Sequence, residues 1–248
     1  MERQISAMFH SIVMPAYNEE EVLRDTIEVL CSELDQSTYQ YEIIIVDDNS
    51  SDRTGTIAAE ISTHRDNVSM VRNTGPNGYG FAIRMGLDIY TGDSVVVVTS
   101  DGSDSAKDIL AYWSKIEAGY ECAFGDRFID GSVVEGYPVV KRLINRLANH
   151  MLGWFIGTDY RDITNGFKCY QRHVIDNMSP IISGQFNITI ELALKAMLAG
   201  HRYAVVPTDW RQRDGGQSSF DVLKLIKPYL ATMAYCISQN YIKSIKRN

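Results

Sequence analysis

Short apolar runs alternate with amphipathic segments along most of the chain. The apolar runs are rich in Val and Ile, which is typical of strands buried on both faces of a parallel sheet. Strands are predicted at 11–14, 41–46, 68–71, 94–98, 121–125 and 201–206, with a further short one after 168. Helices are predicted at 18–34, 53–64, 81–90, 104–118, 139–155 and 188–198. This alternation predicts an α/β fold, a Rossmann-like, mostly parallel central sheet with helices on both faces.

Polar residues follow several of the predicted strands directly. The valine-rich strand 94–98 leads into Asp101-Gly102-Ser103-Asp104, and in 47–54 six of the eight residues are Asp, Asn or Ser. Open α/β sheets bind ligands at the carboxyl ends of their strands. The 101–104 turn therefore has two interpretations: it holds a divalent cation on a diphosphate, or it caps the next helix. In the 47–54 turn, Asp48 is interpreted as an acceptor for a nucleobase or ribose hydroxyl.

Two other polar turns have mainly structural interpretations. Asn18 is predicted to cap the first helix, with the glutamates that follow it favoured by the helix dipole. The glycine-rich turn 73–80 lacks the ending of a P-loop and the Rossmann spacing, so close backbone packing near a ligand is the preferred interpretation. The polar stretch 210–219 is predicted to be a mobile loop that can fold over a site.

The composition narrows the class of protein. The 248 residues are 45% apolar and 22% charged, as in soluble globular proteins. A net charge of -7 gives no support to nucleic-acid binding. The cysteines are too widely spaced for a metal or redox motif and are expected to be reduced thiols; they are Cys31, Cys122, Cys169 and Cys236. Neither a secretory signal nor a transmembrane helix is expected, which predicts a cytoplasmic location.

The last segment of the chain differs from the rest. Residues 220–248 have an amphipathic helical pattern, with a break or kink predicted at Pro228. This segment contains five basic residues and one acidic residue, which gives it a local net charge of +4. This helix can pack on the domain, pair with a second copy in a homo-oligomer, or lie on an anionic membrane. We therefore expect one domain over 1–219 and a basic amphipathic tail over 220–248.

Six motifs in a fixed order resemble those of the inverting family 2 glycosyltransferases, which have the GT-A fold, and most closely the dolichyl-phosphate mannose synthase branch. The motifs are VMPAYNE at 13–19, IIVDDNSSD at 44–52, TSDGS at 99–103, GDR at 125–127, DITNGFK at 162–168 and GQSS at 216–219. The resemblance implies transfer of a sugar, with inversion, from a nucleotide-diphosphate sugar such as GDP-mannose or a UDP-sugar. The implied acceptor is a polyprenyl or dolichyl phosphate, and the implied location is peripheral, on the cytoplasmic face of a membrane.

The resemblance also implies the residues that bind the donor. They are Pro15, Ala16, Tyr17, Glu19, Val46, Asp48, Thr99, Ser100, Asp101, Arg213 and Ser219. The family's Asp-x-Asp metal motif falls on 99–101, where Thr99 replaces the first aspartate, so Asp101 and Ser103 are the expected ligands for Mg²⁺ or Mn²⁺. Ser219 stands where a lysine is usual. Both changes remove charge near the diphosphate, so weaker metal binding and slower transfer are expected.

The acceptor residues follow from the same resemblance. A phosphate monoester is already an anion and needs a cationic cradle, whereas a hydroxyl acceptor needs a general base. The cradle residues implied are Arg127, Lys141, Arg142 and Asn145. Asp101, Arg127 and Arg213 are then the expected catalytic residues. Two alternatives stay open: a glycan hydroxyl acceptor with Glu191 or Asp162 as base, and a nucleotide-sugar-binding protein that has lost catalysis through the changes at Thr99 and Ser219.

Overall fold

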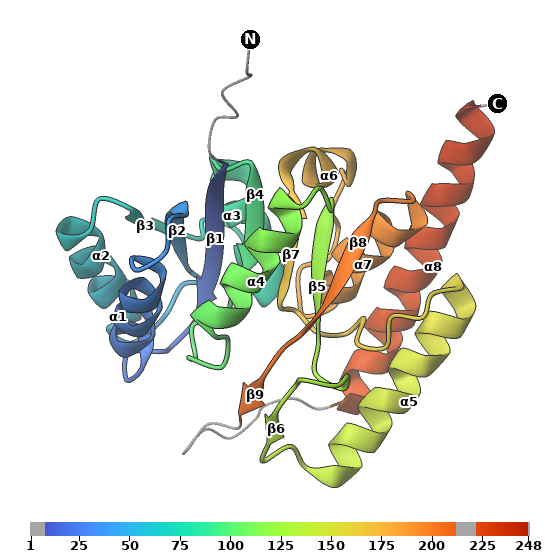
Figure 1. Cartoon of the computed structure of the whole chain (residues 1–248), viewed down its shortest axis with the longest axis horizontal. Helices are drawn as coiled ribbons and strands as arrows, with labels where there is room; N and C mark the ends of the chain where they lie inside the picture. Colours follow the sequence, from blue (N-terminus) through green and yellow to red (C-terminus); the bar gives the residue numbers. More distant parts are fainter. Residues whose placement is uncertain (1–7, 212–221, 248) are drawn as a thin grey trace.

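The fold is organised around one seven-stranded sheet in the order β3-β2-β1-β4-β7-β5-β8 (Figure 1). The computed structural model describes residues 8–211 and 222–247. The strands of the sheet are β1 (Phe9–Ala16), β2 (Gln40–Asp47), β3 (Val68–Arg72), β4 (Ser94–Val97), β5 (Cys122–Asp126), β7 (Lys168–Gln171) and β8 (Tyr203–Pro207). They pair in parallel except β7, which is antiparallel to both β4 and β5. The mostly parallel sheet is therefore confirmed.

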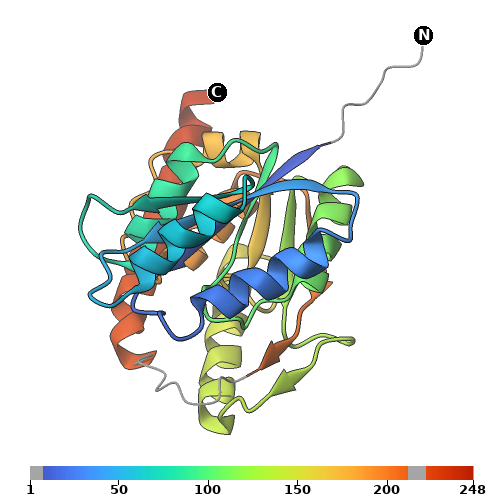
Figure 2. The ribbon, with the colours of Figure 1, turned by 90° about the vertical axis from the view of Figure 1, so that its left-hand side faces the viewer.

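Helices cover both faces of this sheet (Figures 1 and 2). They are α1 (Leu23–Leu34), α2 (Thr54–His64), α3 (Tyr79–Ile89), α4 (Ala106–Glu117), α5 (Val139–Ile156), α6 (Arg172–Asn177), α7 (Ile188–Leu198) and α8 (Val222–Arg247). The hydrophobic core on one face is built by α1, α2 and α4, and the core on the other by α3, α6 and α7 with α8. Successive strand residues serve opposite cores: Ile12 and Met14 face the first and Val13 faces the second. The prediction of strands buried on both faces is confirmed for the central strands β1, β2 and β4.

Three predicted helix features are corrected by the structure. Helix α1 begins at Leu23 rather than at 18, and Asn18 adopts a left-handed conformation with φ of 53° instead of capping it. Asp104 and Ser105 were both expected to cap α4; Ser105 does so, accepting a hydrogen bond from the Asp108 N–H at 3.1 Å, whereas Asp104 does not. Helix α8 continues through Pro228 without the predicted break. The turns that follow Pro228 pack on α7, which offsets the backbone hydrogen bond that proline cannot make.

A small second sheet lies where the sequence analysis predicted only loops. Strand β6 (Val134–Glu135) pairs in parallel with β9 (Trp210–Arg211), at the lower edge of the molecule in Figure 1. The ring centroids of Tyr137 and Trp210 lie 4.8 Å apart beside it. Such two-residue strands carry no periodic signal, so a sequence pattern cannot reveal them.

The structure also describes the cysteines and the lengths of the helices. All four cysteines are free and buried, as predicted. Among the residues that the structure describes, no helix combines the length and the apolar character needed to cross a bilayer.

Candidate active site

The loops after β1 and β2 form one wall at the carboxyl edge of the sheet. The two strands end in register, with Ala16 opposite Asp47. The Asn18 side-chain oxygen accepts from the Ser51 N–H at 2.8 Å, and the Glu19 N–H donates to Thr54 Oγ1 at 2.7 Å. These bonds explain why residues 18–19 and 50–54 are polar. Side-chain oxygens of each loop accept hydrogen bonds from backbone N–H groups of the other loop.

Five predicted donor-binding residues lie at this edge. Pro15, Ala16, Val46 and Ser100 are buried, because they stand at or just beyond the ends of the central strands β1, β2 and β4. Tyr17 is the exception, with a side chain that is 52% exposed. Its ring is therefore the group at this end of β1 that a bound base can contact.

Asp48 lies at the same edge and is held by the glycine-rich turn before α3. Its Oδ1 accepts from Asn73 Nδ2 at 2.6 Å and its Oδ2 from the Gly78 N–H at 2.7 Å. The sequence analysis treated Asp48 as a group left over for a ligand, and these partners 25 and 30 residues away give it a structural role as well. Each carboxylate oxygen can accept a further bond, so a ligand contact is compatible with this role.

The glycine-rich turn packs against backbone, as predicted, but that backbone belongs to residues 183–185. A Cβ on Gly80 would lie 2.6 Å from the Ser183 carbonyl oxygen, so only glycine fits there.

The turn after β4 gathers three side-chain oxygen atoms around the Thr99 hydroxyl. Its hydroxyl oxygen lies 2.7 Å from Asp101 Oδ1, 2.9 Å from Ser103 Oγ and 2.8 Å from Asp104 Oδ2. A hydroxyl carries a single proton and cannot satisfy two charged carboxylates at once. Burial raises the pKa of Asp104 to about 7, and the negative charge of Asp101 adds to this shift. The environment of the two carboxylates therefore favours binding of either a proton or a cation between them.

Asp104 was not among the metal ligands that the resemblance implied, and the sequence left the 101–104 turn as either a cation site or a helix cap because Asp is common in both. Together with Asp101 and Ser103 it forms a set of hard oxygen donors, and this donor set fits Mg²⁺ or Mn²⁺. A cation between the carboxylates would relieve the repulsion that raises the pKa of Asp104. Asp104 thus places a second carboxylate near Asp101 in the turn where Thr99 replaces the first aspartate of the Asp-x-Asp motif.

Arg127, at the end of β5, is locked by Asp162. The guanidinium donates to both carboxylate oxygens, Nε to Oδ2 and Nη2 to Oδ1, each at 2.8 Å. Burial alone would lower the pKa of Arg127, but the adjacent Asp162 carboxylate raises it above its ordinary value. Because Asp162 is fully buried in this bidentate pair, the structure contradicts its interpretation as a general base.

Three guanidinium groups surround the ring of Phe128. Those of Arg127, Arg142 and Arg146 lie 5.5, 5.6 and 5.2 Å from its centroid. The Arg127–Asp162 pair is neutral as a unit, so the exposed Arg142 and Arg146 carry the positive charge of this arginine cluster. Arg146 is not among the acceptor residues that the resemblance implies, and the structure places its guanidinium beside the same ring as those of Arg127 and Arg142.

Two other predicted acceptor residues lie on α5. Lys141 is half-buried in the first turn of the helix. Asn145 donates to Thr164 Oγ1 at 3.0 Å, and Asn149 donates to the same hydroxyl at 2.9 Å. Asn145 thus fastens α5 to the loop that carries Asp162.

Glu191 has no role as a free base. It is completely buried, and accepts bonds from Lys195 Nζ at 2.6 Å and from the Ser183 N–H at 2.7 Å. Burial acts to raise the pKa of Glu191, but these hydrogen bonds outweigh it and hold the pKa below its usual value. The structure therefore contradicts the interpretation of Glu191 as general base. The remaining predicted residues, Arg213 and Ser219 with the motif 216–219, lie outside the described residues.

Comparison with known proteins identifies the family of the chain. The profile of glycosyl transferase family 2 matches residues 11–178. The chain belongs to this family and is a glycosyltransferase. It is 28% identical over 213 residues to a polyprenol monophosphomannose synthase of Mycolicibacterium smegmatis, covering 84% of this chain and 79% of that protein. It is 31% identical to a dolichol-phosphate mannosyltransferase of Pyrococcus furiosus, covering 84% of this chain but only 58% of that protein.

Solved structures confirm the fold. Glucosyl-3-phosphoglycerate synthase from Mycobacterium tuberculosis, in complex with phosphoglyceric acid, matches with a TM-score of 0.70 at 18% identity, covering 92% of this chain and 80% of that one. The same enzyme in complex with Mn²⁺, UDP-glucose and phosphoglyceric acid matches with a TM-score of 0.68 at 18% identity, covering 92% and 79%. The GT-A fold predicted from the sequence is thus confirmed.

Proposed function

We propose that this glycosyltransferase transfers a sugar from a nucleotide-diphosphate sugar to a polyprenyl phosphate, with inversion. The observation that supports a phosphate acceptor is the arginine cluster at the end of β5, formed by Arg127, Arg142 and Arg146 around Phe128. Guanidinium groups recognise phosphate oxygens through charge-assisted hydrogen bonds. The printed names of the polyprenol and dolichol-phosphate relatives support the same class of acceptor.

The donor belongs at the end of β4. There Asp101, Ser103 and Asp104 would hold Mg²⁺ or Mn²⁺ on the diphosphate, and Arg213 would contact the same group. The cation supplies Lewis-acid stabilisation of the departing diphosphate. The Mycobacterium tuberculosis enzyme of this fold, solved with Mn²⁺ and UDP-glucose, supports a donor of this class, whether GDP-mannose or a UDP-sugar.

The reaction needs no protein base. A phosphate oxygen of the acceptor forms a bond to the anomeric carbon while the bond from that carbon to the diphosphate oxygen breaks on the opposite face. The acceptor phosphate is already an anion, so no proton has to be removed. This chemistry agrees with the engagement of both Asp162 and Glu191 in ion pairs.

A lipid acceptor requires a surface that meets the membrane, and α5 supports this part of the proposal. The helix has no acidic residue, and it carries Lys141, Arg142 and Arg146. Eight of its large apolar side chains are exposed; they are Val139, Val140, Leu143, Ile144, Leu147, Met151, Trp154 and Phe155. Apolar, aromatic and basic residues together on one helix are typical of helices that lie in an anionic membrane surface.

The sequence analysis considered membrane contact for the C-terminal segment, as one of three alternatives. Helix α8 packs on α7 and buries Thr232 and Cys236 there. Because Arg142 and Arg146 lie on α5 itself, an acceptor phosphate at the lipid surface would meet the arginine cluster directly. We propose a peripheral position on the cytoplasmic face of the membrane, with α5 against the lipid.

The proposal is tested with the full chain, a polyprenyl phosphate in detergent and a panel of labelled donors. Formation of lipid-linked sugar in Mn²⁺ or Mg²⁺, and its loss with EDTA, is expected for one of the donors. The matched polyprenol without phosphate should not be glycosylated. Transfer to a glycan but not to the lipid phosphate, or binding of nucleotide sugar without turnover, would overturn the proposal.

A further inference from the structure

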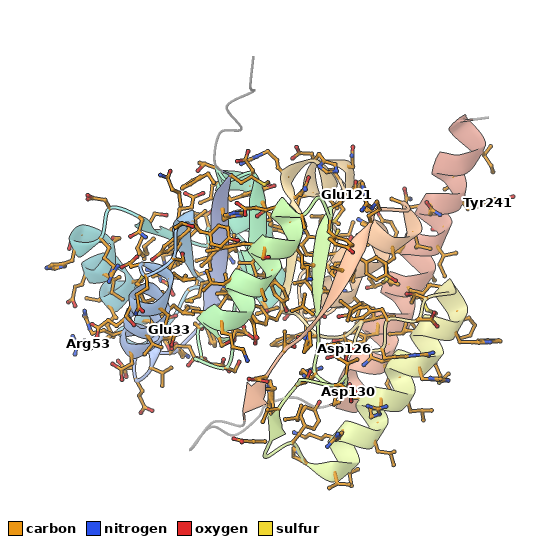
Figure 3. All side chains as sticks on the ribbon, viewed as in Figure 1. Glu33, Arg53, Glu121, Asp126, Asp130 and Tyr241 are labelled. Carbon is orange, nitrogen blue, oxygen red and sulfur yellow. The ribbon has the colours of Figure 1, made fainter. Side chains whose placement is uncertain are left out.

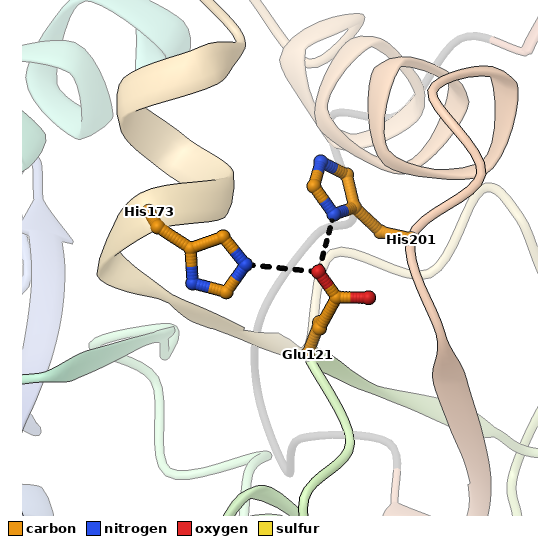
Figure 4. A group of neighbouring side chains, drawn as sticks. All are labelled: Glu121, His173 and His201. Carbon is orange, nitrogen blue, oxygen red and sulfur yellow. Dashed lines mark hydrogen bonds and ion pairs between the residues drawn. The ribbon is translucent and has the colours of Figure 1, made fainter.

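A carboxylate and two imidazoles from separate segments converge at the amino end of β5 (Figure 4). Glu121 precedes β5, His173 lies in the first turn of α6, and His201 lies just before β8. Glu121 Oε1 is 2.9 Å from His173 Nε2 and 2.7 Å from His201 Nδ1. One ligand atom from each residue lies within 4.8 Å of the other two.

This cluster is separate from the candidate active site. Figure 3 shows Glu121 and Asp126 at opposite ends of β5, and Arg127 follows Asp126 directly. The five residue steps from Glu121 to Asp126 span roughly 16 Å of strand. The cluster therefore lies on the opposite edge of the sheet from the residues that would bind diphosphate and acceptor.

Backbone hydrogen bonds hold Glu121 in a fixed orientation. Its N–H donates to the Arg202 carbonyl at 2.9 Å, and its Oε2 accepts from the Arg202 N–H at 2.7 Å. Its carbonyl accepts from the Gln171 N–H at 2.9 Å. One carboxylate oxygen is thus held by the backbone while the other faces the two rings. In metal sites the ligating side chains are likewise oriented by hydrogen bonds to neighbouring groups.

The cluster is also open to solvent. The side chains of Glu121, His173 and His201 are 27%, 49% and 14% exposed. An ion can reach the three ligand atoms, and water can complete its coordination.

We propose that Glu121, His173 and His201 bind a divalent transition-metal cation of the Zn²⁺ class. Two imidazole nitrogens and one carboxylate oxygen suit Zn²⁺, Co²⁺ or Ni²⁺, whereas Mg²⁺ prefers oxygen ligands. Zinc–ligand bonds of about 2.0–2.2 Å place tetrahedral ligands about 3.3 Å apart. The observed distances of 2.7 and 2.9 Å have to open by only about half an ångström. The exposed His173 ring can make this movement.

The bound ion has a structural consequence. It would join α6 and the turn before β8 to the start of β5, the strand that ends at Arg127. Since the ion binds the folded chain, it would raise the unfolding temperature.

The test uses the full chain freed of metal and titrated calorimetrically with Zn²⁺ in excess Mg²⁺, which occupies the oxygen-donor site. We expect one Zn²⁺ per chain, and a Co²⁺ absorption spectrum of nitrogen ligation. His173→Gln, at a half-exposed position, and Glu121→Gln should each weaken Zn²⁺ binding more than about tenfold. Even the loss of a residue that only hydrogen-bonds a metal ligand typically lowers metal affinity by that factor. The matched control His150→Ala, an exposed histidine on α5, should bind as the unmodified chain does.

Equal affinity in His173→Gln, no saturable binding, or equal weakening by His150→Ala would each overturn the proposal. Circular dichroism establishes that each variant is folded before it is titrated. Retention of the zinc site in Asp101→Ala is also expected, because the two sites lie on opposite edges of the sheet.

Discussion

Asp104 Oδ2 accepts hydrogen bonds from both the backbone N–H and the hydroxyl of Thr99, at 2.7 and 2.8 Å. Thr99 occupies the first position of the Asp-x-Asp motif, where the family usually places a carboxylate. The hydroxyl of Thr99 instead holds a carboxylate from five residues further on. The loss of charge in the motif is thereby offset within the same turn.

The first prediction concerns Asp104 as a metal ligand. Asp104→Asn and Asp101→Asn should each lower Mn²⁺ affinity by about tenfold or more, because each removes an anionic oxygen from the same donor set. Calorimetric titration of Mn²⁺ in the presence of a nucleoside diphosphate measures this. Thr99→Ser keeps the hydroxyl and serves as the control. Unchanged affinity in Asp104→Asn would leave Asp104 as a structural partner of Thr99.

The second prediction concerns the arginine cluster. Arg146→Ala should raise KM for polyprenyl phosphate by about ten- to a hundredfold, the equivalent of one charged hydrogen bond of about 1.5–3 kcal/mol. The KM for the donor should stay the same, because the donor site lies after β4. Arg161→Ala, another exposed arginine near α5, is the control. An unaltered acceptor KM in Arg146→Ala would remove this residue from the site.

The third prediction concerns the lipid-facing helix. Replacing Leu147 and Trp154 together by Ser should weaken binding to vesicles that contain phosphatidylglycerol by more than about tenfold. Burial of a large apolar side chain contributes about 1.5–3 kcal/mol, and both side chains are largely exposed in the structure. Co-sedimentation measures the effect. The matched change at Ile237 and Ile245 of α8 should matter little; the reverse result would assign membrane contact to α8.

The fourth prediction concerns pH. His10 is fully buried, stacks on Trp113 at 4.7 Å between ring centroids, and contacts Ser94 Oγ at 2.7 Å. Burial lowers the pKa of His10 to about 4, with Asp93 acting weakly against it. The unfolded chain binds the proton with a pKa near 6.5. Folding stability is therefore lost as pH falls from about 6.5 to 4, by about 3 kcal/mol in total.

Urea unfolding at pH 7 and pH 4 tests this dependence, with His10→Phe as the variant that stacks on Trp113 but cannot titrate. The unmodified chain should lose more stability than the variant over this range. The His10 resonance gives a direct measurement by NMR. A resonance that titrates near pH 6.5 in the folded protein would contradict the prediction.

The strands and most helices were predictable because their signals are local. Val95–Val98 and Ile43–Val46 are continuous apolar runs, and α7 was predicted with the bounds that it has, Ile188–Leu198. The position of β7 was not predictable: its four residues do not specify that they pair antiparallel between β4 and β5. Strand neighbours depend on the whole chain.

The candidate site likewise has features that the sequence predicted and features that it could not predict. The placement of Asp48, Asp101 and Arg127 at one edge followed from their positions after parallel strands. Their partners did not follow, because Asp162 lies 35 residues from Arg127 and Gly78 lies 30 residues from Asp48. The proposed Glu121–His201 pairing, 80 residues apart in sequence, has no local signal at all.

The insertion of β7 has a consequence for the proposed transfer. Since β4 and β5 both pair with β7, their ends lie two strand spacings apart, or roughly 10 Å. Direct pairing of β4 with β5 would halve that separation. In the proposed transfer, the sheet would thus set the separation between the candidate cation site after β4 and the arginine cluster after β5, across which the sugar would pass from one phosphate to the other.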